Sequence, residues 1–272
     1  MDAAKPLAAT VIYPETDDMG EHETQFNIAT FLVPLLTAFL ALQKRVARVA
    51  GNQFWYFAEG KPGRCRAPDV YVVDGVARTD PERATWFTWE GHRPAFALEV
   101  VSAKWKKDYD DAPDDYDAMR AKEVVVFDPG APPDHPRRVR WQVFRRVRGR
   151  GFVRVFAGDG DRVPSRELGC WIRLVAMDGH PRLRVGMGPH GDELLPTAEE
   201  AVVAERAAKE AERARADAAE AEVSRLRAEL ARHARRDRSE TPTPQRAPRR
   251  SPRAGGSSPR RRGRRARPAA PR

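Results

Sequence analysis

Two predicted strands carry a carboxylate where the neighbouring residues are apolar. Asp69 opens the run PDVYVVDG at residues 68–75, and Glu99 lies inside FALEVV at residues 96–101. A carboxylate in an apolar strand is costly unless it is paired or bound to a cation. If the two strands are neighbours in one sheet, both carboxylates can converge on a hard cation such as Mg²⁺, which takes a few carboxylates plus water. A turn-opening aspartate and a solvent-facing glutamate are the alternatives.

The surrounding pattern predicts a sheet covered by helices. Apolar residues recur every three or four positions between Glu21 and Val49, which predicts an amphipathic helix that Pro34 kinks or begins. After several short β-rich runs, residues 113–122 are predicted to form a second helix, followed by the strand EVVVFDP. Further strands are expected at RWQVFRRV, GFVRVFA and RLRV. This order predicts an α/β (α+β) domain over residues 1–196, in which helices flank the sheet.

The composition changes abruptly at Thr197. The segment Thr197 to Glu200 has the pattern of a capping box, and alanine, glutamate and arginine then dominate to about His233. We therefore expect a long polar helix over residues 197–234. Its later apolar residues are in heptad register and predict a coiled coil that joins two copies of the chain, with a single solvated helix as the alternative. The residues that carry this register are Ala216, Ala219, Val223, Leu226 and Leu230.

The basic charge of the chain belongs to its last residues. The formal net charge is +10, yet residues 241–272 hold 11 arginines and no acidic residue, so the rest of the chain is nearly neutral. Residues 235–272 are rich in proline, serine, glycine and arginine, a composition that predicts a disordered tail. Arginines displace counterions from phosphates, so the tail is expected to bind nucleic acid. A solubilising tail is the alternative. The densest cluster comprises Arg260, Arg261, Arg262, Arg264 and Arg265.

Cysteine content and hydropathy indicate a cytoplasmic protein. Cys65 and Cys170 are too few for a disulfide framework and lack the spacing of a zinc site. The N-terminus MDAAKPLAAT lacks the features of a signal peptide. The apolar run at residues 31–42 is about half the length that spans a bilayer and contains Pro34, so we expect a core helix and no membrane association.

Several motifs together resemble one protein family. The run PDVYVVDG, then LEVVS, then D, P, Y and VVVFDP at these spacings resemble the bacterial Uma-two family of restriction-endonuclease-like proteins in the PD-(D/E)xK superfamily. The segments MGEHETQ, SRELGCWIRL and GDELLPTAEE resemble the same family, so the similarity covers roughly residues 10–230. The resemblance implies a restriction-endonuclease-like mixed sheet. It also implies an endonuclease that hydrolyses DNA with Mg²⁺ or Mn²⁺.

The resemblance also assigns roles to three acidic residues. Asp69 corresponds to the aspartate of the PD half and Glu99 to the acidic residue of the second half, so both would be catalytic metal ligands. Glu21 matches an acidic residue near the start of the first helix that can complete such a site. A solvated first-turn glutamate is the alternative for Glu21.

The sequence departs from the family at the lysine. The superfamily position two residues after the acid is Val101, and the alternative position four residues before Tyr116 is Ala112. Three lysines lie in the intervening loop, and Lys107 beside Asp108 is the first choice for a catalytic cation, with a solvated lysine cluster as the alternative. A catalytically degenerate nuclease-fold protein that binds nucleic acid or acts in assembly therefore remains the second hypothesis. A scaffold that binds partners through its long helix is the third.

Overall fold

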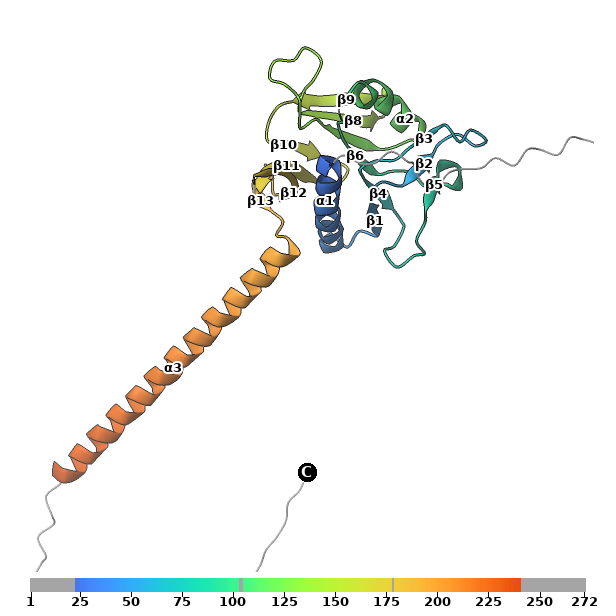
Figure 1. The fold of residues 1–272 in the computed structure, drawn as a ribbon. Helices are drawn as coiled ribbons and strands as arrows, with labels where there is room; N and C mark the ends of the chain where they lie inside the picture. The colour runs from blue at the N-terminus through green and yellow to red at the C-terminus, as the bar shows by residue number, and fades with distance from the viewer. Residues whose placement is uncertain (1–22, 103–104, 178, 241–272) are drawn as a thin grey trace, which may run out of the picture. The chain divides into compact units, whose positions relative to one another are not determined.

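The computed structural model of the protein describes residues 23–102, 105–177 and 179–240. The chain divides into two compact units, residues 1–205 and 206–272, and each is described by itself. In its described residues, the first unit contains three β-sheets and the helices α1 and α2 (Figure 1). In its described part, the second unit consists of most of the helix α3. A sheet flanked by helices and followed by a long C-terminal helix confirms the predicted fold class.

The largest sheet is mixed and has six strands in the order β1-β4-β6-β7-β8-β9. The strands β6 and β7 run parallel, and the other neighbours run antiparallel. The connection from β6 to β7 contains a π-helical turn, Lys107–Asp111, which leads directly into α2, Ala112–Ala118. The strands span Ala47–Ala50 (β1), Val70–Asp74 (β4), Phe96–Val100 (β6), Glu123–Phe127 (β7), Trp141–Val147 (β8) and Gly151–Gly158 (β9).

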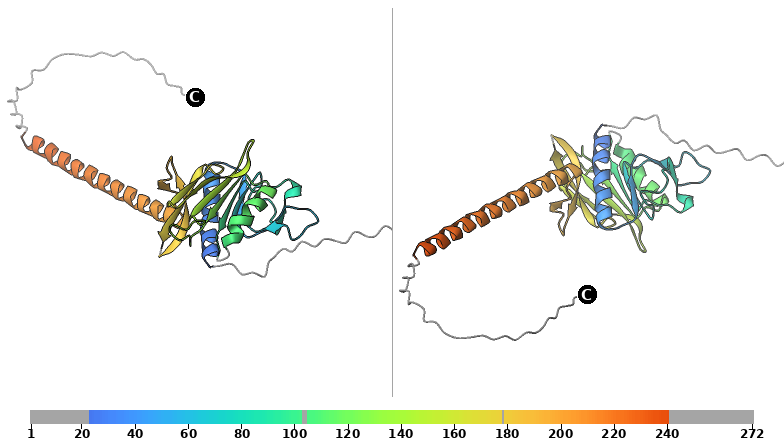
Figure 2. Two further views of the ribbon diagram at one scale, coloured as in Figure 1. Left: turned by 90° about the horizontal axis from the view of Figure 1, so that it is seen from above. Right: turned by 90° about the horizontal axis from the view of Figure 1, so that it is seen from below.

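Alternate residues of this sheet face two separate cores, because successive side chains of a strand point to opposite faces. Leu98 and Val100 of β6 belong to the core that includes α1, Glu23–Leu42. Ala97 of the same strand and Tyr116 of α2 belong to the other core. Figure 2 shows α1 and α2 on opposite sides of the strands. We call the face covered by α2 the α2 face.

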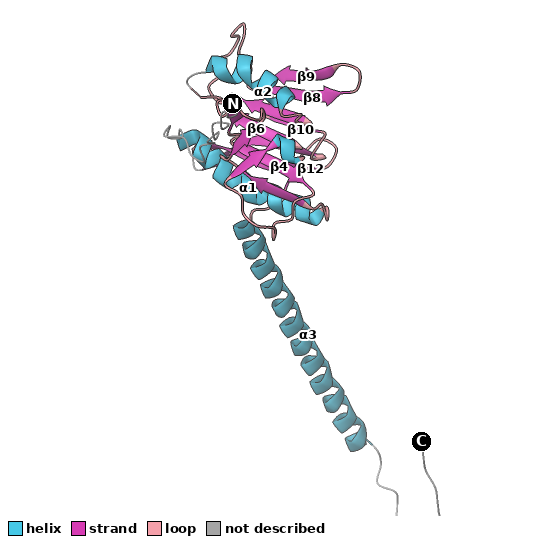
Figure 3. Cartoon of the chain, turned by 90° about the vertical axis from the view of Figure 1, so that its right-hand side faces the viewer, coloured by secondary structure: helices cyan, strands magenta, loops and turns pink. Residues whose placement is uncertain are grey.

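Two smaller sheets complete the first unit. One has the order β10-β11-β12-β13, and α1 packs against β12 as well as against β1 and β4 (Figure 3). The other has the order β3-β2-β5, with the buried Trp55 stacked on Trp86. A short 3₁₀ helix, Thr88–Glu90, follows β5. The strands span Arg162–Ser165 (β10), Cys170–Met177 (β11), His180–Met187 (β12), Glu193–Leu194 (β13), Cys65–Arg66 (β3), Phe54–Tyr56 (β2) and Thr85–Phe87 (β5).

The first helix ends earlier than its apolar pattern predicted. α1 stops at Leu42 rather than near Val49, and Pro34 lies inside it rather than at its start. Lys44 then adopts a left-handed conformation with φ 56°, which turns the chain out of the helix. Residues 47–49, which the apolar pattern assigned to the helix, belong instead to β1, whose backbone is hydrogen-bonded to β4. Sheet pairing therefore overrides the helical spacing at this end.

By length and composition alone, α1 is apolar enough to cross a membrane. Its most apolar window is 39% buried within the protein, and seven of its residues belong to the buried core. The buried core helix of a folded domain can have the same length and apolar composition as a membrane-spanning helix. Cys65 and Cys170 are both free thiols.

The capping box predicted at Thr197 is confirmed. The Glu200 N–H donates to the Thr197 hydroxyl oxygen at 3.1 Å, and the Thr197 N–H donates to a Glu200 carboxylate oxygen at 2.8 Å. The helix α3 spans Ala198–Glu240, so it continues past the predicted end near His233. The tail arginines Arg260, Arg261, Arg262, Arg264 and Arg265 lie outside the described residues, as does Glu21.

Candidate active site

Asp69 directly precedes β4, and Glu99 lies on the neighbouring antiparallel strand β6. Val70 faces Leu98 in the pairing of β4 with β6. Continuing this register by one residue places Asp69 opposite Glu99, and both side chains are on the α2 face. Each residue is only 5% exposed. The two strands are thus neighbours in one sheet, which is the condition under which both carboxylates can converge.

The backbone holds Asp69 tightly in place. The Val100 N–H donates to Oδ2 of Asp69 at 2.6 Å, and the Asn52 N–H donates to the Pro68 carbonyl at 2.8 Å. A Cβ atom at Gly51 would lie 2.1 Å from the Asp69 carbonyl oxygen, far inside van der Waals contact. Glycine is therefore required at position 51, because no side chain fits between it and the Asp69 backbone.

Glu99 is buried between a hydroxyl group and a cation. The Tyr116 hydroxyl donates to Oε1 of Glu99 at 2.6 Å, and Nη1 of Arg66 lies 3.4 Å from the same oxygen. Burial raises the pKa of Glu99, and the Arg66 charge and the Tyr116 hydrogen bond offset only part of that rise. Burial therefore disfavours the charged form of Glu99 even with both partners in place.

Arg66 connects two carboxylates. It comes from the short strand β3, is almost completely buried, and pairs with Asp115 of α2 at 3.0 Å as well as with Glu99. Its guanidinium also lies 5.9 Å from the centre of the Tyr116 ring. Arginine is suited to such a position because its planar group keeps its charge and donates in several directions.

A third buried carboxylate lies beside this cluster. Asp108 belongs to the π-helical turn, and its Oδ2 accepts the Ser102 N–H at 3.2 Å. Burial raises the pKa of Asp108, and the negative charge of Asp108 in turn helps to raise the pKa of Glu99. Single turns of π-helix are rare and often occur at functional sites.

The family lysine positions hold buried apolar residues. Ala112 is fully buried and Val101 is nearly so, and neither side chain carries a charge. Lys107 is exposed at the start of the π-helical turn, and its charge partly offsets the effect of burial on the neighbouring Asp108. The cation in contact with Glu99 is Arg66, which no pattern in the sequence indicated. A strand of two residues is too short to show an alternation of apolar and polar residues, and arginines are usually exposed.

The comparison with protein families agrees with this arrangement. The model of the Uma2 family, described as "Putative restriction endonuclease", matches residues 12–175. The chain belongs to the Uma2 family. The resemblance seen in the sequence motifs is thus confirmed, and membership supports a nuclease-like function.

Among solved structures, one similar chain is described as "a putative nuclease belonging to DUF820 from Anabaena variabilis ATCC 29413". It is 14% identical, with a TM-score of 0.35, and the match covers 54% of this chain and 75% of that chain. No curated protein matches the sequence.

The donor set of this Uma2 protein suits one class of metal. Within the described residues there is no group of three or more His, Cys, Asp or Glu side chains that could hold a metal ion. Mg²⁺, however, is commonly bound through one or two carboxylates, with water and substrate phosphate as the other ligands. Asp69 and Glu99 fit that pattern, because both carboxylates are buried and lie opposite each other in the sheet register.

We expect Arg66→Met to destabilise the Uma2 domain by about 3 kcal/mol, because it leaves the Glu99 carboxylate buried without its cation. Adding Glu99→Gln should recover most of that loss, since the neutral amide needs no counter-charge. Urea unfolding in the presence of a chelator measures both effects.

Arg64→Met is the matched control, because Arg64 approaches the same Asp115 carboxylate at 3.8 Å from an exposed position. It should change stability little. Equal losses of stability in the Arg64 and Arg66 variants would show that the buried Arg66–Glu99 ion pair stabilises the fold no more than an exposed pair does.

Proposed function

We propose that this protein hydrolyses phosphodiester bonds of DNA in a reaction that depends on Mg²⁺ or Mn²⁺. The observation that carries the proposal is the placement of two buried carboxylates, Asp69 and Glu99, opposite each other on adjacent strands of a Uma2 domain. When bound, a divalent cation would polarise a phosphoryl oxygen and lower the pKa of a bound water. Asp69, Glu99 and, outside the described residues, Glu21 are the proposed ligands.

The chain's own residues fix the geometry that such chemistry requires. The Val100 N–H orients the Asp69 carboxylate, and the Tyr116 hydroxyl orients the Glu99 carboxylate. Arg66 is too deeply buried to bind a DNA strand, so its role is to position Glu99 and balance its charge. Lys107 is exposed near Asp108 and stays the proposed cation for the scissile phosphate.

The apolar residues at the family lysine positions favour a second candidate function. With Ala112 and Val101 buried there, the protein could bind nucleic acid without cleaving it. The two functions differ in one outcome, because only the nuclease requires Asp69 and Glu99 for turnover. The two buried carboxylates favour the nuclease, because together they could hold a divalent cation beside a phosphate.

With plasmid and single-stranded DNA as substrates and Mg²⁺ or Mn²⁺ present, we expect Asp69→Asn and Glu99→Gln each to lower cleavage by about 100-fold or more. The control is Asp117→Asn, which alters an exposed carboxylate paired with Arg146. Calorimetry should show that the double variant Asp69→Asn, Glu99→Gln no longer binds the ion. Cleavage by Asp69→Asn at the wild-type rate would refute the assignment, and DNA binding without cleavage by the wild type would favour the second candidate.

We further propose that α3 joins two copies of the chain. Val223, Leu226 and Leu230 are spaced in heptad register and are exposed in the single chain. Replacing all three with glutamate should convert a dimer to a monomer in light scattering, because charges at these positions repel across the seam. Glutamate at Ala221, Ser224 and Ala228, away from the seam, is the control. A monomeric wild-type protein would leave α3 as a solvated helix.

The arginine-rich tail is proposed to contact phosphates without sequence preference. If it makes roughly six contacts, the log-log salt slope of DNA binding should be about −5 for the full chain. Removing residues 241–272, which follow the end of α3 at Glu240, should reduce the slope to about −1. Anisotropy titrations with labelled duplex DNA at several salt concentrations measure both. Equal slopes would place the phosphate contacts in the folded domain.

A further inference from the structure

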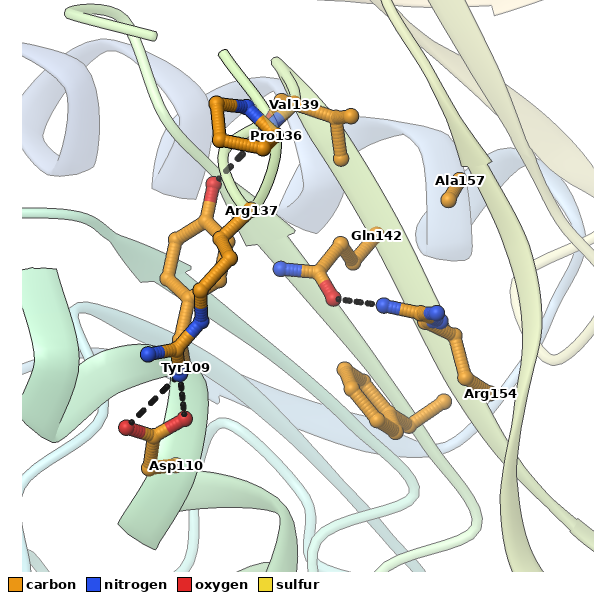
Figure 4. Close-up of a pocket in the computed structure, with 9 residues that line it drawn as sticks. Tyr109, Asp110, Pro136, Arg137, Val139, Gln142, Arg154 and Ala157 are labelled. Atoms are coloured by element: carbon orange, nitrogen blue, oxygen red, sulfur yellow. Dashed lines mark hydrogen bonds and ion pairs between the residues drawn. The ribbon is translucent and has the colours of Figure 1, made fainter.

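A pocket of about 600 Å³ opens on the α2 face of the large sheet, and the nuclease proposal does not use it. The π-helical turn forms one side of the pocket, and β8 and β9 form another. The residues that bear on its chemistry are Tyr109, Asp110, Arg137, Gln142, Phe144 and Arg154, most of which are labelled in Figure 4.

Gln142 has a hydrogen-bond donor that no described residue satisfies. Its side chain is 2% exposed, and its Oε1 accepts a hydrogen bond from Nη1 of Arg154 at 3.0 Å. A guanidinium only donates, so the amide oxygen must face Arg154 and the amide nitrogen must point the other way. Figure 4 shows the nitrogen on the side away from Arg154. Within the described part of the chain this buried nitrogen has no partner, which normally costs folding free energy.

Arg154 contributes a positive charge that no carboxylate neutralises among the described residues. It is exposed on β9, and its guanidinium donates to the neutral amide of Gln142. Arg137, on the same pocket, differs because Asp110 lies 2.8 Å from its guanidinium. An anionic group entering the pocket would therefore interact mainly with Arg154.

Aromatic side chains complete the pocket. Tyr109 and Phe144 line it and are only partly buried. Aromatic rings stack on any of the four nucleobases, and an arginine binds the phosphate. A buried amide donor, a cation and aromatic walls together fit a nucleotide, whose base offers hydrogen-bond acceptors to the Gln142 amide.

The sheet register relates this pocket to the carboxylates. Glu99 of β6 pairs with Val126 of β7, and Val126 pairs with Gln142 of β8. Adjacent strands lie about 4.8 Å apart, so Gln142 is about 10 Å from Glu99 along this row. A strand whose phosphate lies at Glu99 could therefore place a nearby nucleotide at Gln142.

We propose that the pocket between the π-helical turn and the β8–β9 hairpin binds one nucleotide of the DNA strand, near the phosphate placed at Asp69 and Glu99. The inference rests on the proposed nuclease function for its place on the strand. The contacts that define the pocket do not depend on a metal ion. The Gln142 amide nitrogen would donate a hydrogen bond to the base, and the Arg154 guanidinium would donate to the phosphate.

The test is calorimetric binding of the four deoxynucleoside 5′-monophosphates to the full chain in the presence of a chelator. We expect at least one nucleotide to bind, and Gln142→Met and Arg154→Gln each to weaken binding by about tenfold. Arg148→Gln is the matched control, because Arg148 is another exposed arginine of the same hairpin and does not line this pocket. It should bind nucleotide as the wild type does.

The variants also separate a binding role from a structural one. Gln142→Met removes an unsatisfied donor from the core, so its melting temperature should stay close to that of the wild type while nucleotide binding weakens. Failure of the wild type to bind any nucleotide overturns the proposal. So does an equal loss in Arg148→Gln, or wild-type affinity in both pocket variants.

Failure of the pocket can be told apart from failure of the nuclease proposal. Normal DNA cleavage together with wild-type nucleotide affinity in both pocket variants overturns the pocket alone. Nucleotide binding that depends on Gln142 and Arg154, in a protein that does not cleave DNA, supports the pocket and counts against the nuclease.

Discussion

The contact between Arg66 and Glu99 is the interaction on which the rest of the site depends. A glutamate in the middle of an apolar five-residue strand would otherwise leave a negative charge in a low-dielectric core. Because Arg66 comes from the β3-β2-β5 sheet and its other partner, Asp115, comes from α2, the ion pairs bring three separate elements to one point. The carboxylate proposed for chemistry is thus also the one that requires the small sheet and the helix to pack where they do.

Two more buried carboxylates, on and just after the next strand, are also paired with arginines. Glu123 at the start of β7 is fully buried and pairs with Arg145 at 2.6 Å. Asp128, just after β7, is nearly as buried and pairs with Arg138 at 2.7 Å. Ser165 of β10 donates to Glu123, so this carboxylate also ties the large sheet to the second sheet. Arginines of the folded domain therefore neutralise internal carboxylates, and a net charge counted along the chain does not reveal which remain available to a ligand.

The strands that carry the two carboxylates could be predicted because the apolar pattern of a strand is a local property. That Asp69 and Glu99 lie on one face, however, follows only from the pairing of β4 with β6. The capping box at Thr197 was equally readable, since it depends on residues three positions apart. In contrast, the end of α1 was mispredicted because the residues after Leu42 satisfy a helical spacing and still pair with β4.

The partners of these carboxylates could not be predicted from the sequence, because they are distant along the chain and no local pattern indicates them. Arg66 and Glu99 are far apart in the chain, and nothing local to Arg66 indicates that it is buried rather than solvated. Gln142 is a similar case, because a glutamine among apolar residues of β8 can be an exposed edge residue or a buried donor. Such side chains acquire meaning only when the sheet brings them into register with others.

One row of side chains across the α2 face contains both proposed metal ligands and the buried glutamine of the pocket. It runs from Asp69, just before β4, to Glu99 of β6, Val126 of β7 and Gln142 of β8. The polar side chains of this row differ in how many hydrogen-bond and charge partners the described protein gives them. Glu99 has its own cation and hydroxyl donor, whereas the amide nitrogen of Gln142 has no partner among the described residues. Folding alone would favour an apolar residue in place of a buried donor without an acceptor, because the apolar residue avoids the desolvation cost. A glutamine kept in that place, beside an arginine with no acidic partner in the described chain, is better explained by a ligand than by the stability of the fold.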